Sequence, residues 1–98
     1  MAKAQIRFRV PHEIAQLVRG LYPDIKHKVR VALERLAQDL EAGKALQGEL
    51  RGLRSLRVAR LSVIYRAPAR RVIEIMTIGP RDRVYEETLR LVSAGRRR

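Results

Sequence analysis

The sequence predicts an α+β fold, in which an N-terminal strand and an α-helical hairpin precede an antiparallel β-meander and a C-terminal helix. Three patterns predict it. Apolar residues alternate with arginines over residues 5–10, recur every three or four positions over residues 13–42, and are enriched in β-branched types after residue 56. The first and third patterns are typical of strands and the second of amphipathic helices. A chain of 98 residues suits a single domain, 1–98, and we expect about four strands in its sheet.

The first strand is expected over Gln5–Val10. Arginines separate its apolar residues, so one face would be buried and the other exposed; the buried set is Ile6, Phe8 and Val10. Pro11 cannot donate a backbone hydrogen bond and fits the first turn of a helix. The strand is therefore expected to end there.

Two helices are expected next, over Glu13–Gly20 and from Pro23 to about Ala42. The second has one apolar stripe at three- and four-residue steps, formed by Ile25, Val29, Leu33, Leu36 and Leu40. Gly43 follows it and is a candidate C-terminal cap. Because the link between the helices is short, we expect an antiparallel hairpin that covers one face of the sheet.

The β-meander follows a polar, glycine-containing connection at Lys44–Gly52. Leucines at 50, 53 and 56 would also suit a helix, but the β-branched and aromatic residues after Leu56 favour strands. We expect strands at Ser55–Val58 and Arg60–Ala67, joined by a tight turn near Ala59. A further turn at 67–70 leads to a third strand, Arg71–Ile78, which is apolar on both faces and should be central.

The last element is expected to be a helix over Arg83–Ser93. Gly79-Pro80 should break the preceding strand, and Asp82 can cap the helix. Its inward-facing residues are expected to be Val84, Leu91 and Val92. Residues 95–98 read as a basic tail, and the helix would border a basic groove on the second face of the sheet.

Charge restricts the partners. Lys and Arg number 22 against 10 acidic residues, for a net charge of +12. This excess repels itself within a compact monomer and attracts polyanions. Nucleic acid or a strongly acidic protein is therefore the expected partner, and no amphipathic helix with an aromatic face favours a membrane surface.

Several classes of function lack their residues. The chain has no cysteine, so neither a disulfide framework nor a thiolate zinc site is expected. The sequence contains no metal-ligand constellation, phosphate-binding loop or Ser-His-Asp set, and we expect no metal and no cofactor. The N-terminus MAKAQIRFRV lacks the apolar segment of a secretory signal, and no apolar run reaches the roughly 20 residues that span a bilayer. We expect a cytoplasmic protein.

The central stretch resembles the RelE/ParE superfamily of toxins from type II toxin–antitoxin systems. The order of the predicted elements also fits, and the motifs that carry the resemblance are Gly52-Leu53, Leu56-Arg57-Val58, Val63-Ile64-Tyr65-Arg66, and Ile78-Gly79-Pro80-Arg81 running to Val84-Tyr85. The likeness is nearest to the RelE-like mRNA interferases. It implies a toxin that inhibits translation by cleaving mRNA in the ribosomal A site, with the ribosome, mRNA and a cognate acidic antitoxin as partners.

The resemblance also assigns candidate site residues. Arg57, Arg81 and Tyr85 match basic, basic and tyrosine positions of the family's catalytic pattern, in which tyrosine and basic residues act on the scissile phosphate. A series of arginines three residues apart adds RNA-binding candidates, namely Arg51, Arg54 and Arg60. The same arginines would equally form a solvated face, and Tyr85 would equally be a packing residue.

Two positions depart from the fullest version of that pattern. Ser62 stands where a further arginine is usual, and Ser55 stands where another basic residue is common. The first departure favours an alternative function on the same fold, a ParE-like inhibitor of DNA gyrase without catalysis. A non-toxic basic RNA-binding protein is a third hypothesis.

Overall fold

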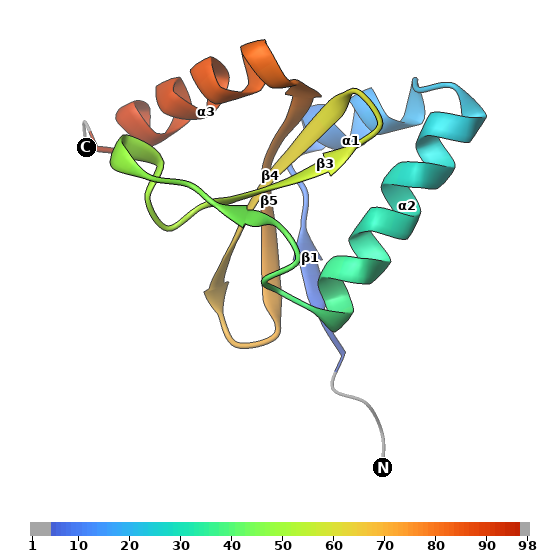
Figure 1. The fold of residues 1–98 in the computed structure, drawn as a ribbon, viewed down its shortest axis with the longest axis horizontal. Coiled ribbons are helices and arrows are strands. Elements are labelled where there is room, and N and C mark those ends of the chain that lie inside the picture. Colours follow the sequence, from blue (N-terminus) through green and yellow to red (C-terminus); the bar gives the residue numbers. More distant parts are fainter. Residues whose placement is uncertain (1–4, 97–98) are drawn as a thin grey trace.

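The computed structural model describes residues 5–96, which form a five-stranded mixed sheet between two helical layers (Figure 1). Helices α1 and α2 cover one face and α3 covers the other. The elements, in chain order, are β1 (Arg7–Arg9), α1 (His12–Arg19), α2 (Pro23–Gln38), β2 (Lys44–Ala45), the 3₁₀ helix η1 (Gly48–Leu50), β3 (Arg54–Val58), β4 (Leu61–Ala69), β5 (Val72–Pro80) and α3 (Arg81–Arg96). The predicted α+β fold is therefore confirmed.

The sheet differs from the predicted antiparallel meander in its two edges. Its order is β1-β5-β4-β3-β2. β1 joins β5 in parallel, with Phe8 opposite Ile73, while β2 adds an antiparallel edge strand beside β3. The expectation of about four antiparallel strands was therefore wrong in number and in one pairing. A parallel pair requires a long crossover connection, and much of the chain, including α1 and α2, intervenes between β1 and β5.

Helix α2 ends at Gln38, earlier than the expected Ala42, and Gly43 is not its cap. Asp39 leaves the helix with extended backbone angles, and its carboxylate accepts a hydrogen bond from the Glu41 N–H at 3.0 Å. Such a local bond from a side chain to the backbone competes with continued helix. The chain is thereby released for the connection to β2.

The junction between β5 and α3 also differs from expectation. Gly79-Pro80 does not break the strand, because β5 continues to Pro80 and α3 begins at the next residue, Arg81. Asp82 therefore lies inside the first turn. Val84 is fully buried as expected, but Leu91 is 50% exposed, so its predicted inward position was wrong. Residues 95–96 continue the helix instead of starting a tail, and 97–98 lie outside the described residues.

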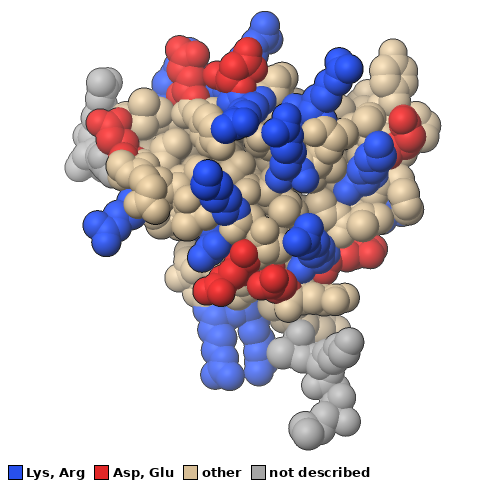
Figure 2. Space-filling model, in the orientation of Figure 1, with Lys and Arg blue, Asp and Glu red and all other residues tan. Residues whose placement is uncertain are grey.

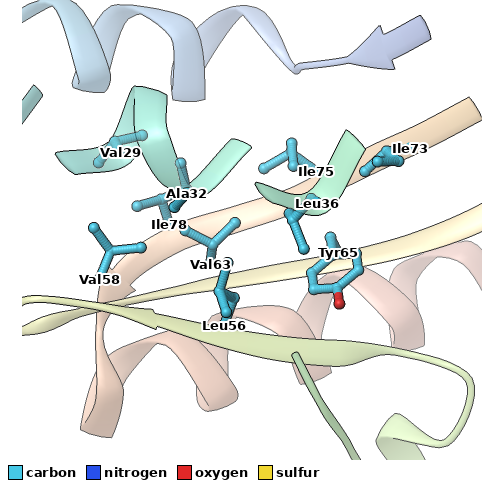
Figure 3. Packing of buried hydrophobic residues seen from close by; sticks show 10 residues of the cluster. All are labelled: Val29, Ala32, Leu36, Leu56, Val58, Val63, Tyr65, Ile73, Ile75 and Ile78. Atoms are coloured by element: carbon cyan, nitrogen blue, oxygen red, sulfur yellow. The ribbon is translucent and has the colours of Figure 1, made fainter. Parts of the chain in front are cut away.

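Each face of the sheet carries its own apolar cluster. The larger cluster lies between α2 and the sheet (Figure 3) and contains Val29, Ala32, Leu36, Leu56, Val58, Val63, Tyr65, Ile73, Ile75 and Ile78. The smaller one lies under α3, with Leu53, Ile64 and Val84 fully buried. β4 supplies fully buried residues to both clusters, and β5 also contributes to both, with Met76 packed against the smaller one.

Tyr65 links the larger cluster to the connection after α2. Its hydroxyl donates to the Leu40 carbonyl at 2.8 Å and accepts from the Gly43 N–H at 2.9 Å. Arg54 donates to the Gly43 carbonyl at 2.7 Å. Backbone groups that are removed from water need such partners, and the phenol and the guanidinium together satisfy both polar groups of Gly43.

We predict that Gly43→Ala destabilises the fold by about 1–3 kcal/mol, the usual cost of overpacking. A Cβ atom at this position would lie 2.7 Å from the Tyr65 ring and hydroxyl and 2.9 Å from the Ser55 carbonyl oxygen. Chemical denaturation measures the loss. The matched control is Gly20→Ala, whose Cβ would make only ordinary contacts at 3.6 and 3.8 Å; equal losses in the two variants would contradict the prediction.

Alkaline pH should weaken the fold through Tyr65. Burial raises the pKa of its phenol above the ordinary value of 10.0, against the lowering effect of the Gly43 hydrogen bond. The folded chain therefore holds the phenolic proton more tightly than the unfolded chain does. This contribution to the free energy of unfolding is complete below about pH 10 and is lost as pH rises through the raised pKa.

Denaturation at pH 8 to 11 measures this effect against Tyr65→Phe, which lacks the titrating group. We expect the stability difference between wild type and variant to shrink above about pH 10. A difference that stays constant across this range would contradict the assignment to Tyr65.

Candidate nucleic-acid interface

One row of paired residues brings the predicted site residues toward the same end of the sheet. Arg57 on β3 pairs with Ser62 on β4, and Ser62 pairs with Gly79 on β5. Neighbouring strands are about 4.8 Å apart, so the Arg57 and Gly79 backbones are separated by roughly 10 Å. Arg81 follows Gly79 by two residues, at the start of α3. The strand pairing therefore puts Arg57 and the start of α3, which carries Arg81, at the same end of the sheet.

Arg57 lies on the face of the sheet that α3 covers. Its neighbours Leu56 and Val58 are buried in the cluster against α2. Side chains alternate between faces along a strand, so Arg57 points to the opposite face. It is exposed there, as predicted from its sequence neighbours.

The first two turns of α3 bring Arg81 and Tyr85 to one side of the helix. Residues four apart in a helix are neighbours on its surface, about 6 Å apart along the axis. Arg81 is exposed, whereas Tyr85 is half-buried and packs against the smaller apolar cluster. Val84, in the first turn of α3, is fully buried in the smaller apolar cluster with Leu53 and Ile64. This packing holds the start of the helix, and with it Arg81 and Tyr85, against the sheet.

The two serines occupy the floor of this surface. Ser62 is only 4% exposed, and Ser55 pairs with Ile64 on the same face. Neither side chain carries charge. In the row Arg57–Ser62–Gly79, Arg57 therefore carries the only charged side chain.

The three RNA-binding candidates lie in different places. Arg51 is exposed just after η1, and Arg60 is exposed in the turn between β3 and β4. Arg54 faces the α2 side, where it bonds the Gly43 carbonyl and lies 3.9 Å from the Glu41 carboxylate. The structure therefore brings Arg57, Arg81 and Tyr85 toward one another, but it turns Arg54 away from them.

Such an arrangement can bind a phosphate and assist proton transfer. Guanidinium groups present planar sets of donors that fit phosphate oxygens, and they stay protonated. A phenol can exchange a proton with a substrate hydroxyl within hydrogen-bond reach. Among residues 5–96 no group of three or more His, Asp or Glu side chains could hold a metal ion. No helix in this range is both long and apolar enough to cross a bilayer.

Sequence reasoning missed how the site is positioned. Gly79-Pro80 was expected to break the strand, but Gly79 is a buried strand residue and α3 begins directly after Pro80. The sequence did identify Val84 as inward-facing, and it packs with Leu53 and Ile64 beneath α3.

The description "ParE toxin of type II toxin-antitoxin system, parDE" belongs to a family model that matches residues 8–85 of this chain. The match runs from Phe8, within β1, to Tyr85 and includes every candidate site residue. The chain belongs to this toxin family. A sequence comparison with curated proteins finds no match.

Solved structures of RelE-type toxins share the toxin's fold. A chain of the toxin–antitoxin complex RelBE2 from Mycobacterium tuberculosis is similar at 25% identity with a TM-score of 0.65, over 80% of this chain and 100% of that chain. A mutant of E. coli toxin RelE in the free state has 16% identity and a TM-score of 0.69, over 89% and 97% of the two chains. The archaeal RelE–RelB complex from Pyrococcus horikoshii OT3 has 20% identity and a TM-score of 0.64, over 82% and 99%.

These comparisons confirm the resemblance stated from the motifs. The protein is a RelE/ParE superfamily toxin of a type II toxin–antitoxin system. The likenesses below 25% identity concern the fold alone. The roles of Arg57, Arg81 and Tyr85 remain predictions.

Substitutions at Tyr85 distinguish a packing role of its ring from a chemical role of its hydroxyl. Its ring contacts the smaller apolar cluster, whereas its hydroxyl has no hydrogen-bond partner within the described part of the chain. We predict that Tyr85→Ala lowers the free energy of unfolding by about 1–3 kcal/mol, through lost apolar contact. Tyr85→Phe should change it by less than about 0.5 kcal/mol. Denaturation of both variants measures this; a large loss in Tyr85→Phe would show that the hydroxyl is structural.

Proposed function

We propose that the toxin is a ribosome-dependent mRNA endoribonuclease, which inhibits translation by cleaving mRNA in the ribosomal A site. The observation that supports it is the junction of β5 and α3, which directs Arg81 and Tyr85 to one side of the helix beside the strand face of Arg57. The hydroxyl of Tyr85 is free of other partners among the described residues, so it is available to a substrate.

The proposed reaction is attack of a ribose 2′-hydroxyl on the adjacent phosphorus. Tyr85, acting as the phenolate, accepts the proton of that hydroxyl as the new oxygen–phosphorus bond forms. The bond to the 5′-oxygen breaks and that oxygen takes up a proton from water, which leaves a 2′,3′-cyclic phosphate on one product and a 5′-hydroxyl on the other. Arg57 and Arg81 bind the phosphate oxygens and stabilise the negative charge that develops on them.

In this proposal, mRNA cleavage depends on the ribosome because the site offers few charged side chains. Ser55 and Ser62 leave it without two further basic side chains, so the protein alone provides limited electrostatic stabilisation. Holding the message in a reactive geometry lowers the barrier without additional catalytic groups. In this proposal the ribosome supplies that geometry.

The proposed regulator is a cognate acidic antitoxin. Two of the similar solved structures are toxin–antitoxin complexes, RelBE2 from Mycobacterium tuberculosis and RelBE from E. coli. Two more are the RelE–RelB complex from Pyrococcus horikoshii and the YoeB–YefM complex from Staphylococcus aureus. The toxin's net charge of +12 provides the attraction for an acidic chain. Binding such a chain over the face that carries Arg57 would block the message.

A second candidate function is inhibition of DNA gyrase without catalysis. The family model that matches is that of ParE, and Ser62 puts a neutral, buried side chain at the centre of the candidate site. An assay of gyrase supercoiling in the presence of the purified toxin distinguishes the candidates. Inhibition that persists in Tyr85→Phe would favour this second function.

We predict that Arg57→Ala, Arg81→Ala and Tyr85→Phe each reduce mRNA cleavage on programmed ribosomes by about 10²–10⁴-fold, the range for removal of a charge-stabilising donor or a general base. Primer extension on translated mRNA measures the new 5′ ends. The matched control is Arg83→Ala, because this exposed arginine lies on the opposite side of α3 from Arg81.

The control should retain cleavage within about threefold of wild type. Absence of new 5′ ends with the wild-type toxin would reject the nuclease proposal. Cleavage that survives in all three site variants would reject these residues as its site.

A further inference from the structure

Five arginines gather around the turn between β4 and β5, far from the candidate site. Figure 2 shows Lys and Arg side chains extending from the lower end of the molecule, where Figure 1 places this hairpin beyond the helical layers. We call these five arginines the hairpin end. They are Arg7, Arg9, Arg66, Arg70 and Arg71, and all five are exposed.

The sheet holds these arginines in fixed relative positions. Arg70 and Arg71 form the two-residue turn between the paired residues Ala69 and Val72. β1 lies beside the turn, with Arg7 opposite Val72, and the Arg7 N–H donates to the Arg71 carbonyl at 2.8 Å. The arginines of β1 and of the turn therefore belong to one rigid corner, although more than sixty residues separate them in sequence.

Only one of the five charges is neutralised. Arg66 forms an ion pair with Glu74, which lies opposite it on β5. In the part of the chain that the structure describes, the other four form no ion pair. Concentrated, unpaired cations of this kind raise the local positive potential and attract a polyanion.

The strand residues of the hairpin end share a face with Arg57. Phe8 and Tyr65 pack in the cluster against α2, so Arg7, Arg9 and Arg66 point to the opposite face. Arg7 and Arg9 are about 6.7 Å apart along the strand, close to the separation of successive phosphates in an extended nucleic-acid strand.

The turn of the hairpin end lies far from the phosphate that the candidate site would hold. Ser62 and Ala69 are seven residues apart on β4, a distance of about 23 Å along the strand, and Arg66, the nearest of the five on that strand, is about 13 Å from Ser62. Helix α3 covers the surface between them. We propose that the hairpin end is a second RNA-binding site, which contacts the phosphodiester backbone of RNA remote from the cleaved bond.

This inference deepens the proposed function and rests on it for the identity of the RNA, which is ribosomal RNA or a distant part of the message. Its test is designed to be independent of cleavage. All binding measurements use the full chain carrying Tyr85→Phe, which removes the proposed chemistry. A loss of binding then reports on the hairpin end alone.

The test variant is Arg70→Ala/Arg71→Gly. Arg71 has a φ of 61°, a conformation that glycine adopts without strain, so this pair removes two charges and keeps the turn. The matched control is Arg19→Ala/Arg30→Ala, which removes two exposed arginines from the helical hairpin on the other side of the sheet. Thermal unfolding of both variants verifies that they fold.

Binding is measured to a labelled single-stranded RNA and to purified ribosomes over a range of salt concentrations. We expect the test variant to bind at least one of them about tenfold more weakly, with the log–log salt slope reduced by about 1.4, since each phosphate contact on a single strand contributes about 0.7. The control should change affinity less than about threefold. Loss on ribosomes alone assigns the site to ribosomal RNA, and loss on the free strand assigns it to the message.

Three results would overturn the inference: equal losses in test and control variants, no binding by the parent protein to either RNA, or an equal loss of binding to poly-glutamate, which would make the corner a site for acidic protein. Cleavage by the toxin with Tyr85 intact is assayed separately. If cleavage is absent but the test variant alone loses RNA binding, the nuclease proposal fails and the second site stands.

Discussion

Burial of β4 on both faces is the constraint on which the remaining structure depends. Val63 and Tyr65 pack toward α2, while Ile64 packs under α3. These three successive residues are at most 1% exposed, so neither helical layer can be removed without exposing one side of the strand. Burying large apolar side chains contributes about 1.5–3 kcal/mol each. The central position of β4 also sets the row that contains Arg57, Ser62 and Gly79.

The arginines that dominate the composition have separate physical tasks. Arg54 satisfies a backbone carbonyl beside Tyr65, and Arg66 pairs with a carboxylate across two strands. Arg57 and the other four arginines of the hairpin end form no ion pair among the described residues. A charge that already has a partner costs more to divert to a ligand than a solvated one does. The structure therefore separates arginines that bond within the fold from arginines that remain available to a ligand, a distinction that the sequence does not show.

The toxin's candidate site depends on a junction without a loop. β5 leads directly into α3, with no loop between Pro80 and Arg81. The buried Val84 packs the first turn of α3 onto Leu53 and Ile64, and this packing positions Arg81 and Tyr85. A binding surface built on rigid elements holds its groups more closely to one geometry than a surface built on loops. The proposed RNA sites at both ends of the sheet share this property, since each is part of a strand pair or of a strand–helix junction.

Local periodicity was enough to predict the order of the main elements and the alternation that exposes Arg57, and short motifs carried the family resemblance. β2 and η1 have no such pattern and were missed. The parallel pairing of β1 and the exposure of Leu91 were decided by tertiary structure. At the end of α2, the local Asp39–Glu41 hydrogen bond is joined by hydrogen bonds between the Tyr65 hydroxyl and both the Leu40 carbonyl and the Gly43 N–H, and no local pattern records a partner more than twenty residues away. The gathering of Arg7 with Arg71 is likewise a product of strand pairing. Contacts between distant segments arise only when the folded sheet brings their backbones together, so periodicity can predict an arginine's face but not its neighbours.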